Sequence, residues 1–121
     1  MARILVIDDE APIRSLLATI LHSAGHEVVE ASSGREGLWV YRQRPTEMVI
    51  VDLLMPEFSG LDTILEFTRE FLNVKVVAIS GMANGDQSLL RTARLLGARQ
   101  SLRKPFGIEE LLCAVRYELT H

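Results

Sequence analysis

Short apolar runs that alternate with helical patterns are the feature that most limits how this chain can fold. The runs at residues 3–7, 49–51 and 74–79 are rich in Val and Ile and carry few polar residues, which is typical of strands buried on both faces. Between them, apolar residues recur at helical spacing. Strands that alternate with helices over this length predict an α/β domain whose parallel sheet has helices on both faces.

Five strands are expected, each followed by a helix. They lie at residues 3–7, 26–31, 49–52, 74–80 and 101–104. The run at 26–31 is less apolar than its neighbours, so we expect it near an edge of the sheet. No stretch has the composition of a linker or a repeat, and residues 1–121 are therefore expected to form one domain.

The composition argues against several classes of protein. No apolar run approaches the ~20 residues needed to cross a bilayer, and the N-terminus lacks the apolar core of a signal peptide, so we expect a cytoplasmic protein without a membrane partner. A net charge of −3 argues against direct binding of nucleic acid. Cys113, the single cysteine, is predicted to be a small core residue. His22, His26 and His121 lack metal-ligand spacing and are predicted on the surface.

Polar side chains follow four of the predicted strands, at the point where each strand ends. They are Asp8, Asp9, Asp52, Ser80 and Lys104. Parallel strands in a doubly wound sheet bring such residues to one edge. Three carboxylates raise one another's pKa unless a cation joins them, and Mg²⁺ prefers oxygen ligands of this kind. A carboxylate beside Mg²⁺, a hydroxyl and an ammonium group is suited to hold a phosphoryl group.

Each of these residues also has a simpler interpretation when it is taken alone. Asp8 and Asp9 precede Pro12 and suit a helix cap, and Asp52 before a Met-Pro pair suits a turn. Ser80 and Lys104 are individually uninformative. Their joint placement at successive strand ends favours the phosphoryl site, because one convergence at the sheet edge explains all five residues.

Four segments, in chain order, resemble the motifs of two-component response regulator receiver domains. They are Val6-Ile7-Asp8-Asp9-Glu10, the stretch from Asp52 to Leu61, Ile79-Ser80-Gly81, and Leu96-Gly97-Ala98 together with Leu102 to Phe106. The resemblance covers the whole chain. It implies a flavodoxin-like doubly wound (βα)5 fold with a five-stranded parallel sheet in the order 2-1-3-4-5, and one receiver domain over residues 1–121.

The resemblance also implies a role for each site residue. Asp52 would accept the phosphoryl group. Mg²⁺ would be bound by Asp9, Asp52 and the Leu54 carbonyl, with Asp8 acting through a coordinated water. Ser80, Lys104 and the Gly81 N–H would contact the phosphoryl oxygens, and the Lys104-Pro105 peptide would be cis.

The implied function is that of a signalling switch in a phosphorelay. A sensor histidine kinase or histidine phosphotransfer protein would dock near Ile13 and Leu17 and donate a phosphoryl group to Asp52. The domain would catalyse its own phosphorylation and slow dephosphorylation. The output would pass to a partner or output domain on the face made by the fourth helix, fifth strand and fifth helix.

Two other functions remain open. A degenerate receiver would serve as a phosphate-independent interaction module. A flavodoxin-like cofactor protein shares the architecture, but clustered acids would repel a flavin phosphate, and no phosphate-binding glycine loop follows the first strand.

The chain departs from the family pattern at three places near the site. Ser101 stands where the family usually has the Tyr or Phe of the switch, so we expect a smaller or differently routed conformational change. Leu54 and Met82 are expected to flank the path of the attacking water. Both are apolar and cannot orient water by hydrogen bonding, so we expect slow self-dephosphorylation.

Basic residues gather late in the chain. They are Arg91, Arg94, Arg99 and Arg103. Arg99 and Gln100 stand where many transcription-factor receivers carry acidic residues that pair across a dimer, which disfavours that dimer here. A solvated face is the simpler interpretation of these arginines, and a partner surface is the alternative.

Overall fold

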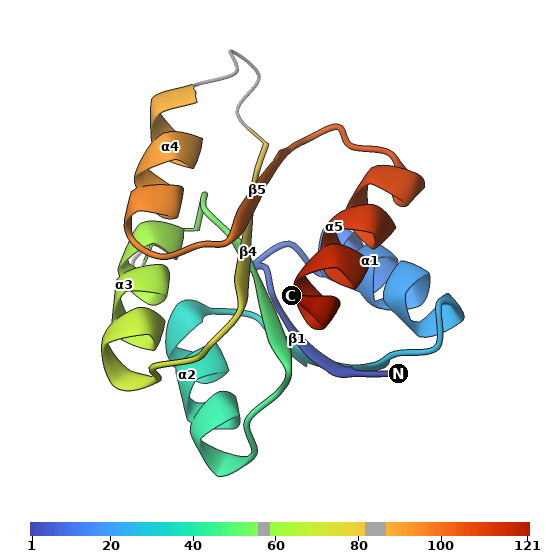
Figure 1. Ribbon diagram of the computed structural model, residues 1–121, viewed down its shortest axis with the longest axis horizontal. Helices are drawn as coiled ribbons and strands as arrows, with labels where there is room; N and C mark the ends of the chain where they lie inside the picture. The colour runs from blue at the N-terminus through green and yellow to red at the C-terminus, as the bar shows by residue number, and fades with distance from the viewer. Residues whose placement is uncertain (56–58, 82–86) are drawn as a thin grey trace.

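A five-stranded parallel sheet forms the centre of the protein, and helices cover both of its faces (Figure 1). The computed structural model describes residues 1–55, 59–81 and 87–121. The elements in chain order are β1 (Arg3–Ile7), α1 (Ala11–Ser23), β2 (Glu27–Ala31), α2 (Gly34–Gln43), β3 (Met48–Asp52), α3 (Gly60–Glu70), β4 (Val76–Ser80), α4 (Gln87–Leu95), β5 (Gln100–Arg103) and α5 (Ile108–Thr120). The strand order is β2-β1-β3-β4-β5, which confirms the predicted doubly wound (βα)5 fold.

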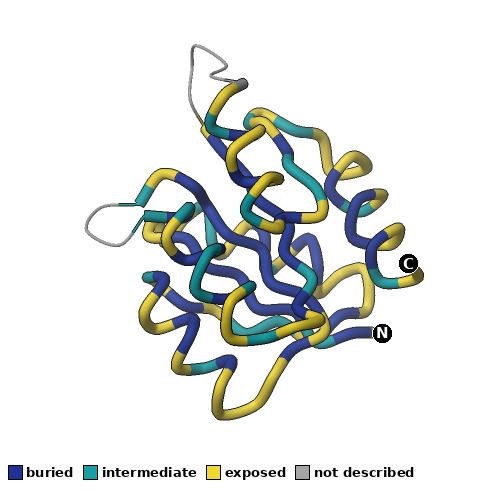
Figure 2. Tube along the Cα trace, turned by 60° about the vertical axis from the view of Figure 1, so that its left-hand side comes forward, coloured by how far each residue is buried: buried dark blue, intermediate teal, exposed yellow. Residues whose placement is uncertain are grey.

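The central strands are buried on both faces, as their apolar sequences predict. Every residue of β3 and of β4 is buried. The less apolar β2 lies at an edge, as expected: two of its five residues are exposed, two are half-buried and one is buried. Figure 2 shows the buried segments passing through the middle of the molecule, with exposed residues on the outer helix faces.

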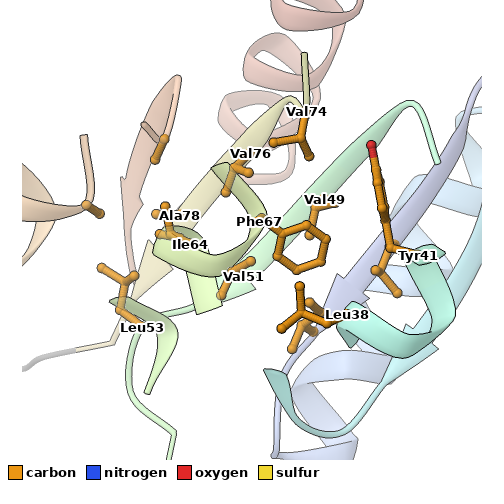
Figure 3. Packing of buried hydrophobic residues seen from close by; sticks show 14 of the residues in the cluster. Leu38, Tyr41, Val49, Val51, Leu53, Ile64, Phe67, Val74, Val76 and Ala78 are labelled. Atoms are coloured by element: carbon orange, nitrogen blue, oxygen red, sulfur yellow. The ribbon is translucent and has the colours of Figure 1, made fainter. Parts of the chain in front are cut away.

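Two apolar cores lie on opposite faces of the sheet. The first lies under α2, α3 and α4, where Phe67 and Tyr41 pack edge to face with ring centroids 5.2 Å apart (Figure 3). The second lies under α1 and α5 and includes Leu17 and Leu111. Because side chains of a strand alternate between faces, β1, β2, β3 and β4 contribute to both cores, whereas β5 contributes Leu102 to the second. No helix in the described part of the chain is long and apolar enough to span a membrane.

The helix boundaries follow from local chemistry. Pro12 occupies the first turn of α1, where its missing N–H costs no hydrogen bond. Gly25, which follows the end of that helix, has φ +95°, a conformation that favours glycine. Ser33 caps α2, since its Oγ accepts a hydrogen bond from the Glu36 N–H at 3.1 Å.

Two predictions about single side chains were wrong. His26 is buried, with 9% of its surface exposed, and its Nδ1 accepts a hydrogen bond from the Ala2 N–H at 3.2 Å. Ala2 and His26 directly precede paired positions of the adjacent strands β1 and β2, a neighbourhood that a spacing argument does not capture. Cys113 is exposed rather than in the core, because the buried stripe of α5 runs through Leu111, Ala114 and Val115. His22 and His121 are exposed, as predicted.

Candidate functional site

The carboxyl ends of the central strands place the predicted site residues side by side. Ile7 of β1 pairs with Val51 of β3, so Asp8 and Asp52 continue from paired positions of adjacent strands. Ser80, the last residue of β4, pairs with Arg103 of β5, and Lys104 follows directly. Asp8, Asp52 and Ser80 are all nearly fully buried. The sheet thus brings two carboxylates, a hydroxyl and an ammonium group to one edge, as the sequence predicted.

A group of three carboxylates meets at this edge. Asp8, Glu10 and Asp52 each offer an oxygen within 4.8 Å of the other two. Oδ1 of Asp8 accepts a hydrogen bond from the Glu10 N–H at 2.9 Å, whereas its buried Oδ2 has no hydrogen-bond partner among the described residues. A buried carboxylate oxygen that lacks a hydrogen bond and lies beside two other acids fits a hard divalent cation with oxygen ligands.

Glu10 is the member of this group that the sequence did not predict. Its signal was its place directly after two acids, but side-chain direction in a turn does not follow from spacing. Asp9, in contrast, is exposed and is not among the three converging carboxylates. Its charge still acts on the site, since it raises the pKa of Asp52.

The carboxyl group of Asp52 titrates abnormally in this setting. Its pKa is raised to about 6, mainly because the group is buried, and the nearby charges of Asp8 and Asp9 contribute to that rise. The Leu54 N–H, which donates to Asp52 Oδ1 at 3.1 Å, and the Lys104 ammonium act in the opposite direction. A buried carboxylate with an elevated pKa is one that gains from a cation or an added hydrogen-bond donor.

Lys104 and Ser80 offer donors at the same edge. Lys104 Nζ lies 3.7 Å from Asp8 Oδ2, and the lysine side chain is 20% exposed. Ser80 Oγ is buried and has no hydrogen-bond partner among the described residues, so it can donate to an anion bound there. The Lys104-Pro105 peptide is cis, as the resemblance implied.

Two glycines border the site closely. A Cβ on Gly81 would lie 3.2 Å from Lys104 Cδ, so a larger residue would displace the lysine chain. A Cβ on Gly60 would lie 2.4 Å from both the backbone oxygen of Asp52 and Leu53 Cα. The start of α3 therefore packs directly on the backbone of Asp52, and only glycine permits that approach.

Arg14 of α1 binds the backbone of the acidic turn that follows β1. Its Nη1 donates to the backbone oxygen of Asp8 at 2.7 Å, and its Nε donates to Glu30 of β2 at 3.1 Å. One guanidinium thus links α1, the turn after β1, and the edge strand.

Leu54 is 42% exposed beside the site. Met82 lies outside the described residues.

Comparison with known proteins gives one consistent result. The family model described as response regulator receiver domain matches residues 4–116. Chemotaxis protein CheY of Thermotoga maritima is 37% identical over 105 residues, which make up 86% of each chain. The phosphate regulon transcriptional regulatory protein PhoB of Pseudomonas aeruginosa is 31% identical over 93% of this chain. That match covers 49% of PhoB, so the chain spans about half the length of such regulators.

Solved structures agree with the sequence matches. A response regulator receiver domain protein from Clostridium thermocellum superposes with a TM-score of 0.92 and 34% identity, covering 99% of this chain and 95% of that one. The response regulator TrrA of Thermotoga maritima, solved in complex with Mg(2+)-BeF, gives a TM-score of 0.87 and 30% identity over 98% of this chain and 99% of that one.

Proposed function

Because the chain belongs to the response regulator receiver family, we propose that Asp52 accepts a phosphoryl group from a phosphohistidine of a sensor kinase or phosphotransfer protein. The observation that carries the proposal is the set of groups around buried Asp52 at the sheet edge. Asp8 Oδ2 and Ser80 Oγ have no hydrogen-bond partner among the described residues, and the Lys104 ammonium lies beside them. These groups suit a bound phosphoryl group and cation together.

Mg²⁺ is the cation that the donor set fits best. Asp8 and Asp52 would hold it through their carboxylates, with the Leu54 carbonyl completing the protein ligands and Asp9 entering by rotation of its exposed side chain. When bound, the ion neutralises these acids and the negative oxygens of the phosphoryl group. The unpartnered Asp8 Oδ2 and the converging oxygens of Glu10 and Asp52 support this assignment.

The transfer itself forms one bond and breaks another. A carboxylate oxygen of Asp52 forms a bond to phosphorus while the bond from phosphorus to the donor's imidazole nitrogen breaks, and the electron pair stays on that nitrogen. The pKa of about 6 leaves Asp52 largely ionised at neutral pH, and so able to attack. Ser80 and Lys104 would bind the transferred oxygens, with the Gly81 N–H assisting.

The donor would dock on an apolar groove beside the site. The groove is lined by Ile13, Leu16, Leu17, Ile20, Phe106 and Ile108 together with Lys104 and Pro105. Leu16 and Ile108 are more than half exposed. A groove that includes Lys104 places a docked histidine near the phosphoacceptor, which supports donor binding at α1.

The signal would arise from the added charge. Phosphorylation brings about −1.5 to −2 charge to the strand ends, and Ser80 and Lys104 would bind it in the active arrangement. The active arrangement would then be read by a partner or output domain on the face of α4, β5 and α5. Leu54 offers no hydrogen bond to an attacking water, so self-dephosphorylation would be slow, with a half-life of minutes or longer.

Mass spectrometry after incubation with acetyl phosphate and Mg²⁺ tests the proposal. The parent protein should gain the mass of one phosphoryl group, and Asp52→Asn should not. When a chelator is added before acetyl phosphate, no adduct should form. An unmodified parent protein that still binds Mg²⁺ would instead identify a phosphate-independent module.

A further inference from the structure

A long stretch of the chain carries positive charge without any acid. Residues 87–108 contain five basic residues and no Asp or Glu, whereas the rest of the chain has eight basic and sixteen acidic residues. One of the five, Lys104, belongs to the site. The other four, called the α4–β5 arginines below, are Arg91, Arg94, Arg99 and Arg103, and all four are exposed.

The fold places the α4–β5 arginines on neighbouring elements. Arg91 and Arg94 are one turn apart on α4, which contacts β5 (Figure 1). Arg99 precedes β5, and Arg103 ends it. Since side chains of a strand alternate, Arg99, Ser101 and Arg103 share one face of this edge strand, while Leu102 packs into the core under α1 and α5.

Two acids of the neighbouring helix α5 have partners of their own. Glu118 of α5 is 5% exposed, and its Oε2 accepts a hydrogen bond from Gln100 Nε2 at 2.9 Å. Glu109, in the first turn of α5, lies 4.0 Å from Arg116. None of the α4–β5 arginines forms a salt bridge with a carboxylate in the part of the chain that the structure describes.

We infer, building on the proposed function, that the α4–β5 arginines bind an acidic segment of a partner protein. Four exposed guanidinium groups that form no salt bridge with the described residues are complementary to Asp and Glu side chains, which arginine binds with two parallel hydrogen bonds. Leu95, 80% exposed between them on α4, adds an apolar contact that a protein segment can use.

A protein partner fits this surface better than nucleic acid or a second copy. A duplex carries one charge per ~1.7 Å, and its extended field would meet the acidic rim of Asp8, Asp9 and Glu10 as well as the arginines. A symmetric dimer through this surface would set arginine against arginine. A short acidic segment avoids both repulsions.

The surface is also connected to the phosphoryl site. Arg103 pairs with Ser80 across the sheet, and Lys104 donates its backbone N–H to the Ser80 oxygen at 2.8 Å. Ser101, which lies between Arg99 and Arg103, carries no ring that would cover this face. A phosphoryl group that draws Ser80 and Lys104 inward therefore acts on β5, which ends at Arg103 and directly follows Arg99.

A labelled short peptide with Glu and Leu at helical spacing is the direct probe, measured by fluorescence anisotropy with the unphosphorylated and the beryllofluoride-treated protein. We expect binding that weakens with added salt and that becomes about tenfold weaker in the double variant Arg94→Glu, Arg99→Glu. The control variant Arg44→Glu, Arg69→Glu makes the same charge change at exposed sites, the C-cap of α2 and the last turn of α3, and should bind nearly as the parent does.

Other outcomes would overturn the inference. Equal loss in the control variant would show that only net charge matters. Tighter binding of a DNA oligonucleotide than of the peptide, lost in Arg94→Glu, Arg99→Glu, would assign the surface to nucleic acid. Concentration-dependent dimerisation abolished by the same variant would assign it to a second copy. Because the peptide is tested without phosphorylation as well, failure here leaves the phosphoryl adduct on Asp52 as a separate result.

Discussion

Lys104 Nζ lies 3.7 Å from Asp8 Oδ2, a carboxylate oxygen that is buried and has no described hydrogen-bond partner. The lysine is therefore the counter-charge that the described residues place nearest to the unpartnered oxygen. The same ammonium group would leave Asp8 for the phosphoryl oxygens upon transfer. Ion pairing within the resting site and phosphoryl binding thus compete for one side chain.

Lys104→Met should separate these two roles. Without a cation, the variant leaves Asp8 uncompensated, and we expect the free energy of unfolding to fall by about 1 to 2 kcal/mol, less than for a fully buried pair because the lysine is partly exposed. Mg²⁺ should reduce this difference in stability between variant and parent. Phosphorylation of Asp52 should nevertheless be slower in the variant than in the parent, with or without extra Mg²⁺. Urea denaturation with chelator or Mg²⁺ measures the first effect. Arg69→Met, at an exposed position of α3, should change neither quantity.

Asp52→Asn should alter how stability depends on pH. The folded-state pKa of about 6 lies above the ordinary 3.8, so between these values the folded protein holds more protons than the unfolded chain. The free energy of unfolding should therefore fall as pH rises through this window, by an amount on the order of 3 kcal/mol.

In chelator, Asp52→Asn should be more stable than the parent at pH 8 and nearly equal to it at pH 4. Added Mg²⁺ at pH 8 should stabilise the parent and have little effect on the variant, because binding to the folded state alone adds to stability. A parent protein whose stability is the same at both pH values, relative to the variant, would contradict the elevated pKa.

Glu10→Gln tests the carboxylate that the sequence did not predict. Its oxygen lies within 4.8 Å of oxygens of Asp8 and Asp52, so we expect the variant to bind Mg²⁺ about tenfold more weakly in calorimetry. Asp9→Asn provides the comparison, since the family resemblance assigns direct ligation to Asp9. Glu66→Gln, on the exposed face of α3, should leave the affinity unchanged. An unaltered affinity in Glu10→Gln would remove Glu10 from the site.

His26 predicts a second pH effect, of opposite sign and far from the site. Burial and the N-terminal amino group lower its pKa from 6.5. Below pH 6.5 the unfolded chain therefore binds more protons at this residue, and the free energy of unfolding should decrease as pH falls. His26→Asn keeps a hydrogen-bond acceptor and does not titrate. The difference between parent and variant, followed from pH 8 to pH 5, isolates this contribution from that of Asp52.

Ser101→Tyr introduces the aromatic side chain that the family resemblance implies for the switch. In the parent, we expect beryllofluoride to change the amide chemical shifts of α4, β5 and α5 only modestly, because no ring moves when Ser80 does. The variant should show larger shifts over the same elements. Equal shifts in parent and variant would show that the signal does not pass through this position.

The sequence predicted the architecture because its information is periodic. Short continuous apolar runs between the helical patterns predict the strands. The topology of parallel sheets then brings Asp52, Ser80 and Lys104 together. What it missed depends on side-chain direction outside regular elements. Glu10 joins the carboxylates through a turn fixed by the Asp8 Oδ1 hydrogen bond. His26 is buried beside Ala2, which precedes the neighbouring strand β1. Neither contact has a pattern in the chain.

The Arg14 bridge gives the outermost strand an influence on the chemistry. Glu30 supplies no group to the phosphoryl pocket, yet through Arg14 it is tied to the very carbonyl from which the acidic turn departs. A protein that binds along the free edge of β2 and breaks the pair between Glu30 and Arg14 would weaken the support that Arg14 gives to the backbone of Asp8. Binding at that edge of the sheet would then change how readily Asp52 is phosphorylated.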